Sequence, residues 1–457
     1  MYIKEIRLEN VRGFHDARDV SLDLTRPDGT LAGWTVLAGR NGSGKTSLLR
    51  AIALAVGGPG VARNLVSDFA SWISVGKRQA VAAVQLSYEA EADRFGSGSP
   101  LPGGPPFWAG LRWEFPDDEL LGPRDLRQPA IVEHFPGSGS RKSPRRGPWS
   151  DNPVGWLCAG YGPFRRLAGG TGDAQRLMLG RGPAARMASL FHEDASLAEG
   201  VSWLIDQHLR SLEKRAGADQ LKSVALAVLG DGLLPDGYQV QDIDSDGLWV
   251  ERGGHRFPLR EMSDGYRTVA ALVVDLLKQV YEAYGRLDVT TSEGLTTVIA
   301  PGVVIIDEVD AHLHVSWQKR IGGWLKRHFP RTQFIVTTHS PYICQAADER
   351  GLIRLPGPDE NSAPEVVDQN LYERIVYGSG DDAVMSELFG LDTPYSEEAV
   401  SLRRELVGLE TSVITGHADA PAVRRYEQLR ELLTSSPTTR VDELAARLLS
   451  DADQPRP

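Results

Sequence analysis

The sequence predicts an α/β fold, and three observations support this prediction. Short apolar segments typical of buried strands alternate with amphipathic segments typical of helices. A glycine-rich stretch, "GRNGSGKT" at residues 39–46, joins a predicted strand to a predicted helix. A second apolar stretch, "VVIIDE" at residues 303–308, is a predicted strand that ends in two carboxylates. These two stretches are the first candidates for a functional site.

Strands and helices are expected in a definite order along the chain. The expected strands are residues 2–9, 34–38, 80–90, 302–307 and 333–340. Helices are expected at residues 45–56 and 315–328, with a further helix that begins at Ser263 or Asp264. Residues 186–230 are expected to be mostly helical, and residues 395–450 a helical tail that is broken near "TGHADAP" and "SSPTT".

Two hairpins are also expected. Residues 95–155 are dense in Gly, Pro and Ser, which predicts a loop-rich insertion with a hairpin at "FWAGLRWEF", residues 107–115. Residues 238–254 predict the second hairpin, because the turn "SDG" separates two strand-like runs.

The composition favours two or three globular domains in a reducing compartment. Apolar residues make up 41% of the 457 positions, which is enough for a substantial core. No run approaches the length of a membrane span, so we expect no signal peptide, no membrane segment and a cytoplasmic location. The two cysteines, Cys158 and Cys344, fit neither a disulfide framework nor a zinc spacing.

Charge is distributed unevenly along the chain. The net charge of −11 argues against the whole chain binding a polyanion, yet residues 121–190 carry eleven basic and four acidic side chains. This stretch could contact nucleic acid or could be a solvated surface, which is the simpler interpretation. Within it, "YGPFRRL" at residues 161–167 could contact nucleotide or nucleic acid, or could be an ordinary turn that covers the core.

Residues 39–46 fit the phosphate-binding pattern GxxxxGK[ST] in full. Gly42 and Gly44 let the backbone curl so that successive N–H groups point at phosphate oxygens. Lys45 can neutralise the β and γ charges, and the Thr46 hydroxyl is placed to bind Mg²⁺. Because a strand precedes the stretch and a helix follows it, the stretch predicts a nucleotide site.

The stretch Val303 to Glu308 supplies the complementary acids. At the end of a buried strand, Asp307 can hold the metal's water shell, and Glu308 can polarise the attacking water as general base. Alone, this pattern could be a strand that ends in solvated acids. Together with the phosphate loop, it predicts a P-loop protein that hydrolyses a nucleotide.

The motifs then resemble those of the ABC-type ATPases, and within them the RecF, SMC and OLD-like group. The opening "IRLENVRGF", residues 6–14, is similar to the "NFRGF"-like start of those proteins, and the two stretches above match their Walker A and Walker B motifs. Asp310 falls at the D-loop and His339 at the switch histidine. Met262 to Tyr266 falls at the signature, where family members commonly read LSGGQ or LSGGE.

This resemblance implies a P-loop ABC-type ATPase head with an antiparallel β subdomain, a helical lobe and a C-terminal helical tail. The implied segments are residues 1–90, the first half of the head with Walker A; 91–160, a Gly/Pro-rich insertion; 161–255, the helical lobe and hairpin; 256–350, the second half with signature, Walker B and switch histidine; and 351–457, a mostly helical docking region.

The resemblance also implies the site residues, with ATP and Mg²⁺ as cofactors. The implied catalytic residues are Lys45, Glu308 and His339, and the implied Mg²⁺ ligands are Thr46 and Asp307. The implied nucleotide contacts are Gly39, Arg40, Asn41, Gly42, Ser43, Gly44, Lys45, Thr46, Ser47, Arg12, Ser263, Gly265 and Asp310. Alternatively, His339 could cap a loop at its strand end, and Arg12 could be a surface arginine.

In such heads the signature helix faces the γ-phosphate of ATP held by the other subunit, so a homodimer or higher oligomer is implied. Ser263 and Gly265 agree with the signature pattern, and Gly265 would keep the approach free of a Cβ atom. Two residues depart from the pattern: Asp264 replaces the first glycine, and Tyr266 replaces the final Gln or Glu. The Asp264 carboxylate should be repelled by a triphosphate beside it. We therefore expect Asp264 to turn away and cap the helix or pair with Arg267.

Two patterns that the sequence lacks narrow the range of possible biological roles. A rod-armed SMC protein would need a long heptad run, and a Toprim nuclease would need a glycine-bounded acidic strand pattern; the sequence has neither. Compact heads of this type resemble the ATPase subunits of antiphage systems such as Septu and PARIS, which act with a separate nuclease. The resemblance thus implies an ATPase that controls a DNA-associated or defence complex. The alternatives are an ATP-locked scaffold that holds an effector, and a transporter subunit.

Overall fold

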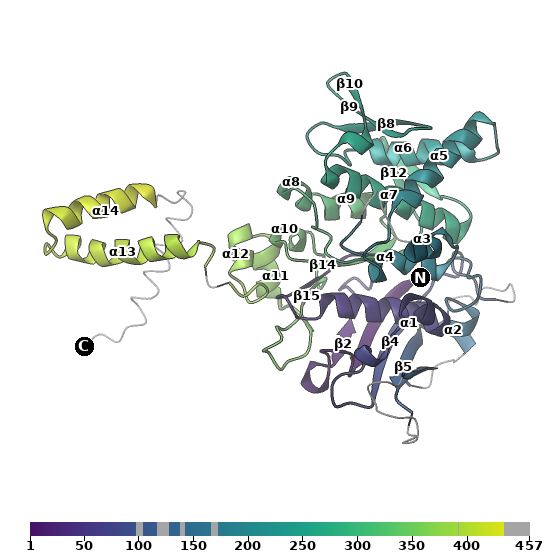
Figure 1. Ribbon diagram of the computed structural model, residues 1–457, viewed down its shortest axis with the longest axis horizontal. Coiled ribbons are helices and arrows are strands. Elements are labelled where there is room, and N and C mark those ends of the chain that lie inside the picture. Colours follow the sequence, from purple (N-terminus) through teal and green to yellow (C-terminus); the bar gives the residue numbers. More distant parts are fainter. Residues whose placement is uncertain (97–103, 117–127, 138–141, 166–171, 392, 434–457) are drawn as a thin grey trace. The chain divides into compact units, whose positions relative to one another are not determined.

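The chain divides after Gly390 into two units, which we call the head (Met1–Gly390) and the tail (Leu391–Pro457). The computed structural model in Figure 1 describes all residues except 97–103, 117–127, 138–141, 166–171, 392 and 434–457. Within the described residues, none of the helices is both long enough and apolar enough to cross a membrane.

A six-stranded sheet forms the centre of the head, with the strand order β16-β15-β3-β14-β13-β7. Its strands are β3 (Gly33–Ala38), β7 (Cys158–Tyr161), β13 (Gly302–Ile306), β14 (Thr332–Thr338), β15 (Leu352–Arg354) and β16 (Glu365–Val366). All neighbours are parallel except β15 and β16. Strand β13 is buried throughout and sends Val304 and Ile306 into one core and Val303 and Ile305 into the other. The sheet is therefore covered on both faces, as its continuous apolar strands require.

One face carries helix α1 (Lys45–Leu65), beyond which lies a five-stranded antiparallel sheet. The strands of that sheet are β1 (Tyr2–Glu9), β2 (Val20–Asp23), β4 (Gln79–Ser87), β5 (Phe107–Glu114) and β6 (Ala130–Glu133). The hairpin expected at residues 107–115 is wrong, because these residues form the single strand β5. Gly110 pairs with Ala83 of β4 and makes no turn, so the insertion contributes two strands to this sheet.

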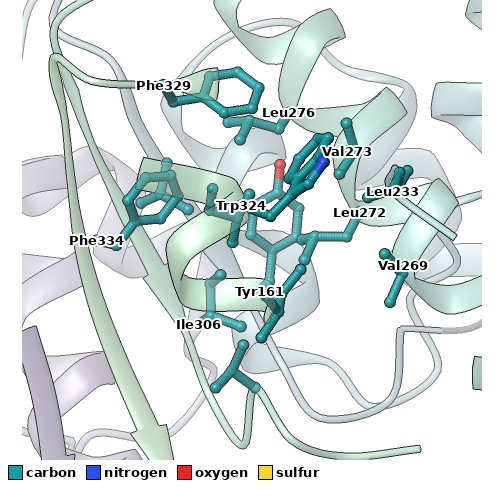
Figure 2. Close-up of a cluster of buried hydrophobic side chains, with 14 of the residues drawn as sticks. Tyr161, Leu233, Val269, Leu272, Val273, Leu276, Ile306, Trp324, Phe329 and Phe334 are labelled. Carbon is teal, nitrogen blue, oxygen red and sulfur yellow. The ribbon is translucent and has the colours of Figure 1, made fainter. Parts of the chain in front are cut away.

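The helical lobe packs against the other face. It contains α5 (Ala198–Leu212), α6 (Ala218–Gly230) and α7 (Asp264–Tyr284), with strands β8 (Gln239–Asp244), β9 (Gly247–Arg252) and β10 (His255–Pro258). Helix α4 (Pro183–Phe191) instead packs against the edge strand β7 and against α1, and α3 (Gly172–Leu179) packs on α4. The second expected hairpin is confirmed as β8 and β9, and β10 extends it. Figure 2 shows apolar side chains of α7, among them Val269, Leu272 and Leu276, packed with Phe334 and Ile306 of the central sheet.

The remaining elements are short. They are α2 (Lys142–Arg146), β11 (Val289–Ser292), β12 (Leu295–Val298), α8 (Val315–Gln318), α9 (Ile321–His328), α10 (Pro341–Cys344), α11 (Gln369–Val376) and α12 (Gly380–Val384). The single helix expected at 315–328 is therefore broken into α8 and α9. The Gln318 side chain donates to the Leu313 carbonyl at 2.8 Å and accepts from the Ser340 hydroxyl at 2.6 Å, which holds α8 to the end of β14.

The tail contains two helices, α13 (Glu397–Ile414) and α14 (Ala420–Leu432). Ser396 and Asp419 cap them, and the Glu405 carboxylate accepts two hydrogen bonds from Arg425 across the pair. These helices confirm the expected helical character of the region up to Leu432, while residues 434–450 of the prediction lie outside the described residues.

Candidate nucleotide site

The phosphate loop lies between the end of β3 and the start of α1, as the sequence predicted. Gly44 precedes the first residue of α1 and has a left-handed backbone with φ +94°, which glycine adopts without a steric penalty. A Cβ atom there would also lie 2.6 Å from the ring of Phe14. The loop therefore presents its backbone N–H groups at a helix N-terminus, which favours an anion.

Two polar side chains of the loop fit a bound phosphate group. Lys45 is 7% exposed, and its Nζ donates to the carbonyls of Gly39 at 2.8 Å and Arg40 at 3.2 Å. The Ser43 hydroxyl is buried, and no described residue offers it a hydrogen bond. Arg40 instead extends outward and pairs with Asp359 at 3.3 Å, while Asn41 is exposed.

The Walker A and Walker B residues meet directly. The Thr46 hydroxyl donates to Asp307 Oδ2 at 2.6 Å, although 261 positions separate the two residues. The other oxygen of Asp307 accepts from the Thr337 hydroxyl at 2.5 Å. A hydroxyl beside a carboxylate is a set of oxygen donors that suits Mg²⁺, so these residues fit the metal that the family implies.

The next residue, Glu308, is held in a left-handed conformation with φ +45°, which is uncommon for a side chain of its size. Its N–H donates to Thr337 Oγ1 at 2.7 Å. Asp310 accepts from the Thr338 hydroxyl at 2.5 Å, so the end of β14, directly before His339, also orients the D-loop position. The structure thus brings Lys45, Thr46, Asp307, Glu308, Asp310 and His339 into one site.

The charges of this site act on one another. Burial lowers the pKa of Lys45, and the carboxylates of Asp307, Glu308 and Asp310 oppose that shift. Partial burial and then the charge of Lys45 lower the pKa of His339. The histidine is therefore neutral at neutral pH and offers one donor and one acceptor nitrogen.

Arg12 lies beside the first turn of α1. Its Nη1 donates to the Ser47 hydroxyl at 3.1 Å, and its guanidinium lies 4.3 Å from the centre of the Trp72 ring. Burial, followed by the charge of Arg50, lowers its pKa. Arg12 is therefore half-buried between the antiparallel sheet and the phosphate-loop helix.

The signature residues lie at the start of α7. Ser263 is the N-cap residue, but its side chain makes no capping hydrogen bond and is exposed. Asp264 pairs with Arg267, as expected from the sequence, and this contact lowers the pKa of Asp264. A Cβ atom on Gly265 would lie 2.6 Å from the carbonyl oxygen of His312, so this glycine is required within the chain itself.

A pocket of about 230 Å³ lies next to the signature, and Ser263, Gly265, His312 and Trp317 help to line it. Among the described residues, none from the phosphate loop lines this pocket. The signature and the phosphate loop therefore do not share this pocket.

Some residues of the site were not singled out in the sequence. Thr337 and Thr338 orient Asp307, Glu308 and Asp310, and the motif "TTHS" was the only signal for them. Arg165, in the ambiguous run "YGPFRRL", is buried against the Walker B turn, whereas Arg166 lies outside the described residues.

Comparisons with known proteins agree with this geometry. Residues 206–345, which include the signature, Walker B and His339, match a family model described as "AAA domain, putative AbiEii toxin, Type IV TA system". Residues 5–113, which include the phosphate loop, match a second model described as "AAA domain". Two parts of the chain, one with the phosphate loop and one with the Walker B strand, are therefore similar to AAA domains.

Similar curated proteins come from bacteria. The chain is 33% identical over 120 residues to a retron Ec83 probable ATPase from Escherichia coli. These residues are 26% of this chain and 21% of that protein. It is 26% identical over 346 residues to Septu protein PtuA from Bacillus mycoides, which is 74% of this chain and 38% of the relative. A Septu PtuA from Bacillus thuringiensis is 26% identical over 44% of this chain and 50% of its own length. The chain thus spans half or less of the length of these relatives.

Solved structures similar to this chain include SMC head domains. One, an SMC head bound to the C-terminal winged-helix domain of ScpA, is 17% identical, with a TM-score of 0.46 over 80% of this chain and 97% of that one. Another, the SMC head domain from Thermotoga maritima, is 16% identical, with a TM-score of 0.41 over 80% of this chain and 100% of that one.

Proposed function

We propose that this head binds ATP with Mg²⁺ and hydrolyses it. The observation that carries the proposal is the contact of 2.6 Å between the Thr46 hydroxyl and Asp307, with Glu308 next in the chain. The match to AAA-domain models on both halves of the head, and the retron relative that is named a probable ATPase, support it.

The proposed roles follow from the placement of each side chain. The N–H groups of the phosphate loop and the Lys45 ammonium bind the β- and γ-phosphates. Thr46 and Asp307 hold the Mg²⁺, which when bound neutralises phosphate charge. Arg12 and Ser47 lie at the same helix start, where a further positive charge can approach the nucleotide.

Hydrolysis then requires a base next to the γ-phosphate. Glu308 accepts a proton from a water molecule, whose oxygen attacks the γ-phosphorus while the bond to the β-phosphate oxygen breaks, which leaves ADP and phosphate. The neutral imidazole of His339 orients the water or a γ-phosphate oxygen through a hydrogen bond, and Asp310 is held beside it by Thr338.

We further propose that two heads close around two ATP molecules. The start of α7 has free N–H groups and an uncommitted Ser263 hydroxyl, and none of the described phosphate-loop residues lines the pocket beside it. In a head-to-head pair these groups bind the γ-phosphate of the partner's ATP, and release follows hydrolysis. Because relatives are named Septu PtuA and retron ATPase, the complex we propose acts in antiphage defence on a DNA-associated target, with a separate nuclease.

The test uses the mass in solution of E308Q protein, measured by light scattering with and without Mg-ATP. Loss of the base should trap a closed pair, so the mass should rise with Mg-ATP, and the added S263A substitution should prevent the rise. Wild-type protein should release phosphate from ATP, and E308Q should not. A mass that never changes in a protein without phosphate release would contradict the proposal, and a stable ATP-bound assembly without turnover would favour a scaffold instead.

A further inference from the structure

Arg165 follows β7 and connects this strand to the Walker B turn. Its side chain is 2% exposed. Nη1 donates to the carbonyls of Gly162 at 3.0 Å and Asp307 at 2.9 Å, and Nη2 donates to those of Glu308 at 3.0 Å and Val309 at 3.3 Å. One guanidinium therefore holds three successive carbonyls of the Walker B turn against the end of the neighbouring strand.

Burying the Arg165 guanidinium costs free energy, and a role in covering the core alone does not explain this cost. Burial lowers the pKa of Arg165 to about 10, while the charges of Asp310, Asp307 and Glu308 raise it, so the group is protonated at neutral pH. Its four hydrogen bonds to the described residues all end on carbonyl oxygens, so no carboxylate bonds directly to the charge. Burying a charge without a bonded counter-charge is unfavourable, and an apolar side chain could fill the same space.

The geometry that Arg165 holds is itself unfavourable for the backbone. Glu308 has φ +45°, a conformation that persists in a residue other than glycine only where the surroundings enforce it. Two contacts do so from opposite sides of the residue. Thr337 accepts from the Glu308 N–H at 2.7 Å, and Arg165 donates to the Glu308 carbonyl at 3.0 Å. The direction in which the Glu308 side chain leaves the backbone depends on both contacts.

We propose that Arg165 is a positioning residue for ATP hydrolysis, which fixes the backbone of the Walker B turn and thereby aims the Glu308 carboxylate. The inference rests on the proposed ATPase function. Lys45 and Thr46 make none of their hydrogen bonds to Arg165. Arg165 bonds to the backbone carbonyl of Asp307, whereas the carboxylate that we assign to the metal is held by Thr46 and Thr337. Loss of the guanidinium should therefore lower turnover and leave nucleotide affinity unchanged.

The experiment compares R165Q and R165K with wild type and with R186Q as a matched control. Arg186 is also buried, at 5% exposed, and burial also lowers its pKa, but it lies in α4 and has no hydrogen bond to the Walker B turn. The measurements are kcat and KM for Mg-ATP by phosphate release, the Kd of a fluorescent ATP analogue, and thermal unfolding by circular dichroism. R165Q should lower kcat about 10- to 100-fold, as loss of an orienting contact does elsewhere, with an unchanged Kd. R186Q, which changes a buried arginine outside the site, should leave kcat unchanged.

The outcomes separate this inference from the function on which it rests. If wild-type protein releases no phosphate, the proposed function fails and the inference fails with it. If wild type turns over, E308Q does not and R165Q keeps the wild-type kcat, only the positioning role is overturned. A Kd that rises as much as kcat falls would also overturn it, because Arg165 would then hold the whole site. If R165Q does not fold, R165K decides: lysine keeps the charge but cannot span three carbonyls, so kcat should fall at constant Kd. An unchanged kcat in R165K would overturn the proposal.

Discussion

Thr337 offers a test of how the Walker B acids are held, because its hydroxyl is shared by both. The residue is fully buried, donates to Asp307 at 2.5 Å and accepts from the Glu308 N–H at 2.7 Å. T337V keeps the shape and removes both contacts. A hydrogen bond to a charged group contributes about 1.5–3 kcal/mol, and an orphaned N–H costs about 1–3 kcal/mol. The methyl group recovers part of this, so we expect T337V to lower the free energy of unfolding by about 3 kcal/mol.

The assay is urea unfolding of the wild-type, T337V and T337S proteins, together with ATP turnover. A loss of about 3 kcal/mol is a roughly hundredfold change in the unfolding equilibrium. T337S keeps the hydroxyl and loses only a buried methyl, so it should be destabilised by about 1 kcal/mol and keep its turnover. The reasoning is refuted if T337S is less stable than T337V, because packing of the methyl group would then matter more than the shared hydroxyl.

Three further changes have clear expected outcomes. G265A should lower the free energy of unfolding by about 1 kcal/mol in chemical denaturation, because the clash with the His312 carbonyl exceeds the gain in helix propensity; equal stability would contradict the close approach. Burial lowers the pKa of His328 below 6.5, so in the window just below pH 6.5 the unfolded chain binds a proton that the folded chain does not. The free energy of unfolding should therefore fall as the pH falls through that window, and denaturation curves of H328Q should show a weaker dependence than wild type. D264N should leave the melting temperature unchanged at low and high salt, because the pair of Asp264 with Arg267 is solvent-exposed; a clear fall would assign the pair a structural role.

Much of the fold could be predicted because its signals are local. The apolar run of β13, the glycines before α1 and the turn between β8 and β9 each determine an element within a few residues. The hairpin expected at residues 107–115 failed for a non-local reason. Its central glycine suggests a turn, but the segment pairs along its length with β4, and that partner cannot be identified from the segment itself.

The difference between local and non-local signals also decides which residues of the site could be predicted. The phosphate loop and the Walker B acids are contiguous patterns, so the sequence alone singled them out. Thr337 was missed because its role depends on sheet register: Ile306 pairs with Val336, which places Asp307 and Thr337 side by side at the strand ends. Arg165 was ambiguous because three of its four partners are backbone carbonyls more than 140 positions away, and every residue has such a carbonyl, so the sequence does not mark them.

The signature residue Gly265 is needed for packing within its own chain and is also proposed to face the partner's phosphate, and comparison with Ser263 separates these two roles. Gly265 is needed inside its own chain, because the His312 carbonyl leaves no room for a Cβ atom. Any substitution there perturbs the folded head, whether or not a partner's phosphate approaches α7. Ser263 is different: its hydroxyl makes no capping bond, so removing it takes away no interaction that stabilises the isolated head. A loss of ATP-driven association in S263A, at unchanged stability, would therefore report on the contact between subunits, whereas the same loss in G265A would not.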